Sequence, residues 1–452
     1  MANSVRSARC PEAGAAGGGL YRPRSPRASP LWQCAKRHAS ELRASGHASN
    51  RPRRAVEQQV IERFIACGDP HEGFARIYCD TCRHEFLLAY SCKTRYFCPS
   101  CHQKRVILYG EWVEQNVLAP VAHRQYVFTL PKLLRPIFSR HRAWLGELCR
   151  ISARLLTNAY AAAAPGAQPG LVLFVQTFGD LANFNPHLHV LAADGVFGAE
   201  GTFTALPPVP EALLAEGFRR AVLAFLVKAG AITHELRVKM LGWRYCGGFS
   251  AHNRVRVGDR EGRMKLAGYM IRAPMSLAKM TYDRASGTVI YRSKMHLGLK
   301  RNFQVMPGAQ WLELLCKHIP DRYEHLVRYV GWYSNRARGE RAKALNSLKE
   351  QAQVTQAAAN LETASGFAGR AKATWARLIR KVYEADPLVC PKCNGPMRVI
   401  ALIDDPGVVR RILEHLGRWA PEPTERGPPE EAPDWPRNAV IPITYHPVPD
   451  IA

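Results

Sequence analysis

The sequence predicts an α+β protein in which a cysteine-rich module precedes the main domain. Between residues 120 and 340, segments with the two-residue period of a strand alternate with segments that have the spacing of a helix. Two Cys-x-x-Cys pairs lie before this region, within residues 56–112, and a basic stretch with helical spacing follows it, within residues 341–452. No apolar run is long enough for a membrane-spanning helix, so we expect no membrane partner.

The charge of the chain favours a polyanionic partner. Its 452 residues carry 63 Lys and Arg against 37 Asp and Glu, a formal net charge of +26. An excess of this size, spread along the chain, is typical of proteins that bind nucleic acid, although a protein can also be merely basic. Residues 1–55 are rich in Gly, Pro, Ser and Arg, and we expect a largely disordered basic arm there, with room for a short helix at residues 30–42.

The elements of the main domain follow from periodicity and from the residues that interrupt it. Strands are predicted where β-branched and aromatic residues alternate with others up to a Gly or Pro, at residues 123–130, 169–179, 187–197 and 287–294. Helices are predicted where apolar residues recur every three or four positions, at residues 55–67, 106–118, 134–162, 210–230 and 260–274. Residues 341–385 have helical spacing and are basic.

The cysteines of the N-terminal module have the spacing of a zinc site. Cys79-x-x-Cys82 and Cys98-x-x-Cys101 are separated by fifteen residues. Each pair forms a tight turn in which two thiolates converge, and two such turns supply the four ligands of tetrahedral zinc. The sequence therefore predicts one structural zinc ion at these four cysteines.

Other cysteines leave several interpretations open. Cys67 and Cys92 flank the four predicted ligands, and they are either part of an additional zinc site, a replacement for one ligand, or buried free thiols. Near the C-terminus, Cys390-x-x-Cys393 opens a small unit and has no second pair close to it in the sequence. Half a zinc site is weak support for metal binding.

Basic and aromatic residues alternate within the cysteine module. The cations expected to contact DNA here are Lys93, Arg95, Lys104 and Arg105, with aromatic residues between them. Cations contact phosphates and aromatic rings stack on bases, so this module is a candidate DNA reader. The alternative is that the aromatic residues only form the small core of the module.

Two histidines one residue apart, His187 and His189, lie on a predicted strand. Successive side chains of a strand point to opposite faces, so both imidazoles should point the same way. Gln176 lies on the preceding predicted strand, and antiparallel pairing would bring its amide oxygen beside them. Two imidazoles and one oxygen would hold a divalent cation that neutralises charge in phosphoryl transfer. An ordinary polar strand residue at position 176 is an equally good interpretation.

Tyr269 is the candidate nucleophile. It lies on the predicted helix at residues 260–274, with Lys265 one turn before it and Arg272 shortly after it. A phenol needs nearby positive charge, or a metal-bound phosphate, to react at neutral pH, and these two cations supply the charge. Lys265 and Arg272 are also candidate DNA contacts. Most helical tyrosines are only core or surface residues.

The order of these motifs resembles a known family. A cysteine module is followed by "HRQYVFTLPKLLRP", "QTFGDLANFNPHLHVLAADGVF", "GYMIRAPMSL", "HIPDRYEHLVRYVGWYSNRARG" and "CPKCNGPMRVIAL". The chain looks like the rolling-circle transposases of the insertion sequence ninety-one family, within the His-hydrophobe-His (HUH) endonuclease superfamily. The resemblance covers about residues 30 to 415. Because the positions one turn either side of Tyr269 hold Lys265 and Ala273, it is closest to the single-tyrosine branch.

The resemblance implies a fold, a reaction and roles for residues. It implies a catalytic domain at residues 120–340 with an antiparallel, RNA-recognition-like sheet. His187 and His189 match the metal-binding histidines, Tyr269 matches the tyrosine that attacks DNA, and the four predicted ligands match the zinc-binding domain. The cofactors would be structural Zn²⁺ and catalytic Mg²⁺ or Mn²⁺. The partner would be single-stranded or hairpin DNA at element ends, in the bacterial cytoplasm in association with the nucleoid.

Two other functions are compatible with the same residues. A plasmid replication initiator or relaxase would use the same chemistry, although the zinc module and the basic C-terminal region favour the transposase. A zinc-dependent DNA-binding protein without catalytic activity would need the cysteines and the charge but not Tyr269.

Overall fold

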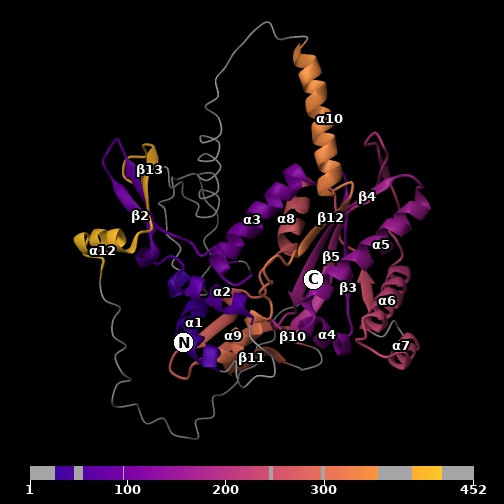
Figure 1. Cartoon of the computed structure of the whole chain (residues 1–452), viewed down its shortest axis with the longest axis horizontal. Coiled ribbons are helices and arrows are strands. Elements are labelled where there is room, and N and C mark those ends of the chain that lie inside the picture. Colours follow the sequence, from indigo (N-terminus) through magenta and orange to yellow (C-terminus); the bar gives the residue numbers. More distant parts are fainter. Residues whose placement is uncertain are drawn as a thin grey trace, which may run out of the picture.

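The computed structural model describes residues 26–44, 54–94, 96–243, 248–296, 301–354 and 389–419. Within these ranges the strands form three antiparallel sheets, each accompanied by helices (Figure 1). Mixed α and β content with antiparallel sheets agrees with the expected class, whereas the RNA-recognition-like topology stays a prediction. Among the described helices, none has the length and apolarity needed to cross a membrane.

The largest sheet has seven strands and lies at the centre of the main domain. Its strand order is β12-β4-β5-β3-β7, with β6 paired to β5 and β8 paired to β3. The strands are β3 (His123–Thr129), β4 (Gln168–Phe178), β5 (Phe184–Phe197), β6 (Phe203–Ala205), β7 (Ser250–His252), β8 (Arg256–Val257) and β12 (Val327–Gly331). The predictions of β3, β4 and β5 from alternating apolar residues are thus confirmed.

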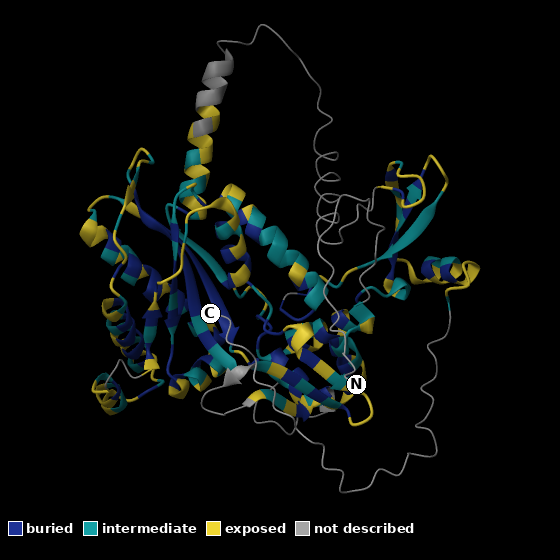
Figure 2. Ribbon diagram, turned by 180° about the vertical axis from the view of Figure 1, so that it is seen from behind, coloured by how far each residue is buried: buried dark blue, intermediate teal, exposed yellow. Residues whose placement is uncertain are grey.

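Helices cover this sheet on both faces, which is why β4 and β5 are buried almost throughout (Figure 2). Leu173 and Val190 point to one face, where they pack with α4 (Arg135–Arg140), α5 (Leu145–Ala163), α6 (Glu211–Lys228) and α7 (His234–Leu241). Phe174 and Leu191 point to the opposite face, where they pack with α3 (Pro99–Asn116) and α8 (Arg260–Met270). Successive residues of one strand therefore belong to different cores.

The second sheet packs against helices from the start of the described chain. Its order is β11-β10-β9, from β9 (Met280–Asp283), β10 (Thr288–His296) and β11 (Arg301–Pro307). It shares an apolar core with α1 (Pro30–Ala44), α2 (Ala55–Ile65) and α9 (Gly308–Cys316). Leu31 and Cys34 of α1 are fully buried in this core. The short helix that the sequence allowed at residues 30–42 is present as α1, and its apolar face is buried in this core instead of belonging to a free arm. Residues 1–25 and 45–53 lie outside the described residues.

The third sheet joins the N-terminal module to the C-terminal unit. Its order is β13-β1-β2, from β1 (Phe74–Cys79), β2 (Glu85–Ala89) and β13 (Met397–Ile403), and α12 (Pro406–His415) packs against it. Figure 1 shows this sheet and α12 together at one side of the molecule. The sequence predicted that the module at residues 56–112 and the C-terminal unit are separate. This prediction is wrong, because β13 pairs with β1 along its whole length.

The basic helical region begins earlier than expected. Helix α10 (Asn335–Val354) follows β12 closely and is largely exposed along its described side chains. Residues 355–388 and 420–452 lie outside the described residues. Short 3-10 turns complete the described elements, at η1 (Pro26–Ala28), η3 (Pro70–Glu72), η4 (Lys132–Leu134), η5 (Arg142–Trp144) and η7 (Leu277–Lys279).

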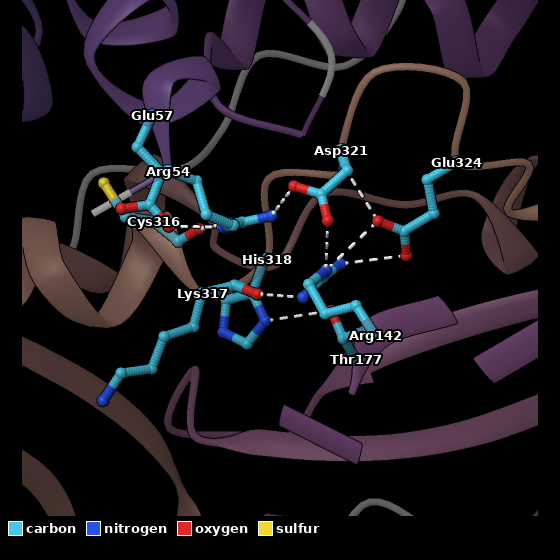
Figure 3. A network of polar contacts seen from close by, with 9 residues as sticks. All are labelled: Arg54, Glu57, Arg142, Thr177, Cys316, Lys317, His318, Asp321 and Glu324. Carbon is cyan, nitrogen blue, oxygen red and sulfur yellow. Dashed lines mark hydrogen bonds and ion pairs between the residues drawn. The ribbon is translucent and has the colours of Figure 1, made fainter. Parts of the chain in front are cut away.

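A buried ionic network connects the second sheet's helices to the central sheet (Figure 3). Arg142 makes a two-point ion pair with Glu324, with Nε–Oε2 and Nη2–Oε1 distances of 3.1 Å, and donates to the carbonyl of Lys317 at 2.7 Å. Arg54 donates to Asp321 Oδ1 at 2.6 Å. The loop between α9 and β12 therefore receives guanidinium groups from two different parts of the chain.

His318 extends this network to the turn between β4 and β5. Its Nε2 donates to the carbonyl of Ala182 at 2.6 Å, and its Nδ1 lies 3.0 Å from Thr177 Oγ1. Burial lowers the pKa of His318 to about 3, so the ring is neutral and Nδ1 accepts from the hydroxyl. Ala182 has a φ of 55°, a left-handed conformation that is costly for alanine and that this hydrogen bond helps to hold.

We expect Glu324→Gln to destabilise the protein. The substitution keeps the shape of the side chain and leaves the Arg142 guanidinium, whose side chain is only 7% exposed, without a buried counter-charge. Removing one partner of a buried pair costs about 3 kcal/mol or more. The midpoint of urea unfolding should fall accordingly.

Glu313→Gln is the matched control. Its ion pair with Lys317 spans 3.9 Å and its side chain is 44% exposed, so its loss should cost at most about 1 kcal/mol. Equal urea midpoints for the two variants would show that the buried network adds no more to the stability of the protein than a surface ion pair does.

Candidate active site and cysteine clusters

His187, His189 and Gln176 lie together on the sheet face covered by α3 and α8. The antiparallel pairing of β4 and β5 places Gln176 opposite His187 and Phe174 opposite His189. The two imidazole centroids are 4.9 Å apart. The predictions that the histidines point the same way and that Gln176 comes beside them are both confirmed. Their role as metal ligands stays a prediction.

Helix α8 brings Tyr269 onto the same face. The Tyr269 ring centroid lies 6.0 Å from that of His189, with the ring planes almost perpendicular. Gln176 Nε2 donates to the backbone carbonyls of Met270 at 2.7 Å and of Tyr269 at 3.3 Å, which ties the end of α8 to β4. The Tyr269 side chain is nevertheless 45% exposed, so a large substrate can reach it.

The close packing of α3 against α8 sets the position of Tyr269. A side chain at Gly110 of α3 would place its Cβ 2.7 Å from the carbonyl oxygen of Met264, so only glycine permits this approach. At the other end of the contact, His102 Nε2 donates to the carbonyl of Ile271 at 2.7 Å. Burial lowers the pKa of His102 to about 4, and the neutral ring serves as a hydrogen-bond donor rather than a free ligand.

The hydrogen bonds of the two histidines decide which nitrogen is available to a metal. His187 Nδ1 donates to the carbonyl of Asn185 at 2.8 Å, which leaves the lone pair of Nε2 free. His189 Nδ1 lies 2.6 Å from the side-chain amide of Gln125 on β3. If the Gln125 side-chain amide is rotated by half a turn, its Oε1 accepts a hydrogen bond from His189 Nδ1–H. The lone pair of His189 Nε2 then faces the site.

Two buried atoms that could bind a metal have no hydrogen-bond partner among the described residues. They are Gln176 Oε1 and His189 Nε2. Burying polar atoms without partners costs free energy, which a divalent cation between them would recover. Burial lowers the pKa of His187, and it lowers the pKa of His189 to about 3, with His187 and Arg272 adding to the effect. Neutral imidazoles and an amide oxygen are a donor set that fits a divalent metal.

The two cations predicted beside the nucleophile differ in their surroundings. Arg272 places its guanidinium carbon 4.6 Å from the centroid of the Tyr269 ring and 5.4 Å from that of Phe178, and its buried Nε has no partner among the described residues. Lys265 points to the surface of α8, where it pairs with Glu261. Of the two cations predicted beside the phenol, Arg272 lies against its ring, whereas Lys265 pairs with Glu261 on the exposed side of α8.

A pocket opens beside Arg272. Its lining includes the first residues of α3, where helix N–H groups point outward, together with Gln103, Phe178 and Lys279. Lys104 and Arg105 follow on α3 and are half-buried, whereas Lys93 is exposed. Arg95 lies outside the described residues. Their role as DNA contacts stays a prediction.

Tyr245, Tyr282 and Tyr291 are the other tyrosines near this part of the chain, and the two that the structure describes are less well placed than Tyr269. Tyr291 is buried, and its hydroxyl accepts from the backbone N–H of Ser276 at 3.1 Å. The hydroxyl of Tyr282 lies 3.0 Å from His38 Nε2 in the core of the second sheet. Tyr245 lies outside the described residues.

Among the described residues, eight cysteines form two four-thiol clusters, and neither is the predicted one. The first cluster joins the thiols of Cys67, Cys92, Cys98 and Cys101, and the second joins those of Cys79, Cys82, Cys390 and Cys393. The prediction that the two N-terminal Cys-x-x-Cys pairs share one ion is therefore wrong. Sheet pairing explains the difference, because β1 carries Cys79 to the end of β13, where Cys79 is in register with Met397.

The first cluster lies where α2 ends and α3 begins. Cys67 Sγ is 3.9 Å from Cys98 Sγ and 3.8 Å from Cys101 Sγ, and Cys92 Sγ is 3.6 Å from Cys101 Sγ. These distances exclude disulfides and match the roughly 3.8 Å between sulfurs that Zn–S bonds of about 2.3 Å require in a tetrahedron. Hydrogen bonds from Cys67, Cys92 and Cys98 lower the pKa of Cys101. Cys67 and Cys92 thus belong to a zinc-like site rather than being free thiols.

Gln125 is the site residue that sequence reasoning did not identify. It lies in the predicted strand at residues 123–130, at the position whose side chain points to the same face as His189. A polar side chain within a predicted strand was the available signal, and it was weak because the preceding residue, Arg124, is polar as well. Only the pairing of β3 with β5 shows which residue it contacts.

Comparisons with known proteins agree with this arrangement. The family model described as "Transposase zinc-binding domain" matches residues 34–130, and the one described as "Putative transposase" matches residues 170–368. The transposase for insertion sequence element IS801 of Pseudomonas savastanoi pv. phaseolicola is 26% identical over 305 residues, 64% of this chain and 72% of that protein. The "Putative transposase y4qJ" of Sinorhizobium fredii is 26% identical over 358 residues, 72% of this chain and 84% of that protein. No solved structure matches the chain.

The matched regions contain the parts of the site described above. The zinc-binding match includes the first cysteine cluster and α3, and the transposase match includes β4, β5 and α8 with Tyr269. The two matches follow the same order along the chain as the sequence motifs, with a zinc-binding domain first and a transposase domain after it. The chain therefore belongs to the insertion sequence ninety-one family of transposases.

Proposed function

We propose that this transposase cleaves and rejoins single-stranded DNA at element ends by the rolling-circle route. The observation that supports this most directly is the position of Tyr269 on the sheet face that carries His187 and His189. A half-exposed phenol beside two neutral imidazoles, of which His189 is buried and His187 is half-buried, combines a nucleophile with metal-ligand atoms. Those are the two components that metal-assisted phosphoryl transfer by a tyrosine needs.

The reaction exchanges one phosphoester for another. Tyr269 Oη attacks the scissile phosphorus and loses its proton, while the bond from phosphorus to the 3′ oxygen breaks and that oxygen takes up a proton. The products are a 5′-phosphotyrosine and a free 3′-OH. The energy of the phosphodiester is retained, so attack by a 3′-OH on the phosphotyrosine reseals a strand without ATP.

His187, His189 and Gln176 would hold Mg²⁺ or Mn²⁺. When bound, the ion would neutralise charge on the phosphate oxygens, although imidazole ligands also accept Zn²⁺ or Ni²⁺. Gln125 orients His189, and the carbonyl of Asn185 orients His187, so each ring presents one nitrogen to the site.

Arg272 and the start of α3 would guide the phosphates on either side of the cleaved bond. The Arg272 guanidinium lies against the Tyr269 ring, and its Nε, which has no partner among the described residues, can donate to a phosphate oxygen. The N-terminus of α3 at the same pocket adds helix N–H groups that favour an anion. Single-stranded or hairpin DNA can expose its backbone to such a pocket.

Two other functions that are compatible with the sequence can be distinguished from this one by experiment. A replication initiator or relaxase would cleave a plasmid origin rather than element ends. A DNA-binding protein without catalytic activity would form no covalent adduct with either substrate.

Tyr269→Phe should abolish the covalent protein–DNA adduct and leave the fold intact. The change removes only the hydroxyl of a side chain that is already 45% exposed, so little packing is lost. The measurement is a denaturing gel of the protein with labelled single-stranded end DNA and Mn²⁺. Tyr323→Phe, at a tyrosine that is 75% exposed, is the matched control and should retain the adduct. A shifted band that persists in Tyr269→Phe would identify a different nucleophile.

Gln125→Leu should raise the Mn²⁺ concentration needed for half-maximal nicking by about tenfold or more, because His189 loses the partner that orients it. Gln125→Glu keeps an oxygen that accepts from Nδ1–H, and it should nick at close to the wild-type rate in saturating Mn²⁺. The measurement is a metal titration of the nicking rate. An unchanged metal requirement in Gln125→Leu would show that Gln125 does not act through a metal ligand.

A further inference from the structure

We propose that the second cysteine cluster binds a zinc ion of its own, and that this ion fastens the C-terminal residues 389–419 to the N-terminal β1–β2 hairpin. The ligands are Cys79, Cys82, Cys390 and Cys393. Two of them lie outside the residues that match the zinc-binding domain. The proposal does not depend on the nicking chemistry.

The two Cys-x-x-Cys turns have the same backbone hydrogen bonds. Cys79 N–H donates to the carbonyl of His84 at 2.8 Å, and Arg83 N–H donates back to the carbonyl of Cys79 at 2.9 Å. The C-terminal turn repeats this pattern, with 2.8 Å from Cys390 N–H to the carbonyl of Gly395 and 2.9 Å from Asn394 N–H back to Cys390.

The two Cys-x-x-Cys turns also have similar backbone angles. The residue after each second cysteine is left-handed, with a φ of 60° at Arg83 and 55° at Asn394. Backbone N–H groups also approach the sulfurs in the C-terminal turn, at 3.4 Å from Lys392 to Cys390 and at 3.4 Å from Gly395 to Cys393. Two such turns facing each other are the usual halves of a four-thiolate zinc site.

The four sulfurs are close enough to share one ion. Cys79 Sγ lies 3.5 Å from Cys393 Sγ, and Cys82 Sγ lies 3.4 Å from Cys390 Sγ. All four lie within 4.8 Å of one another. The separations of 3.5 and 3.4 Å are too long for disulfide bonds and near the spacing of a zinc tetrahedron. A cluster of four cysteines is also the donor set that selects zinc over magnesium or manganese.

Apart from the pairing of β13 with β1, the module has only a small apolar core to hold its C-terminal part in place. Its fully buried apolar side chains fall into two small groups, of which one contains Ile77 and Met397 and the other contains Phe74, Val409 and Leu413. The Asp80–Arg398 ion pair beside the turns is exposed and contributes little. A sheet with so small a core depends on metal binding for much of its folding free energy.

Zinc content and hydrogen exchange in the full chain test this proposal. Protein purified without chelator should contain two zinc ions per chain. Cys82→Ser and Cys393→Ser replace exposed cysteines and should each lower the content to about one. Both variants should also lose hydrogen-exchange protection of the β13 amides, although Cys82 is 308 residues from its partner Cys390.

Two control variants separate the sites. Cys101→Ser should also remove about one zinc ion, but from the first cluster, and should leave β13 protected. Cys34→Ser, at a cysteine outside both clusters, should keep two zinc ions. If Cys82→Ser keeps the wild-type zinc content, or loses zinc while β13 stays protected, the proposal is wrong.

Discussion

The register between β4 and β5 is the constraint on which the candidate active site depends. Alternate side chains of these strands enter different cores, so Gln176, His187 and His189 share a face only while Gln176 pairs with His187. A shift of one residue would turn both imidazoles toward α5 and would bury Leu188 against α8. The turn between the strands is held at Ala182 by His318, whose loop is itself fixed by Arg142 and Arg54 (Figure 3).

Burial gives the site its chemical character. Helices on both faces of the sheet exclude water from His189 and Gln176, which keeps the imidazole neutral and leaves acceptor atoms unsatisfied. Tyr269, by contrast, comes from the end of α8 and stays accessible. The ligand atoms are buried in a rigid part of the fold, whereas the nucleophile is exposed to solvent. The cation site can therefore stay preorganised while a long substrate enters and leaves.

The two cysteine clusters stabilise different contacts. The first joins the end of α2 to Cys98 and Cys101 at the start of α3, and α3 packs closely on the helix that carries Tyr269. Metal binding there would therefore set the position of a helix that is part of the active site. The second, in the proposed zinc form, joins the β1–β2 hairpin to residues 389–419 in a separate sheet. Loss of the first ion should consequently affect catalysis more than loss of the second.

The sequence by itself determined the features that depend on local periodicity. Alternation along a strand showed that His187 and His189 share a face, and helical spacing placed Tyr269 on a helix shortly before Arg272. Cys-x-x-Cys spacing likewise identified tight turns that bring two thiols together. Contacts between distant segments were decided only by the tertiary structure. It selected Gln125 as the partner of His189, packed α1 into a core, and paired Cys79 and Cys82 with cysteines near the C-terminus. The entropy of closing a loop grows only slowly with its length, so a distant partner costs little more than a near one, and strand pairing determines which cysteines meet.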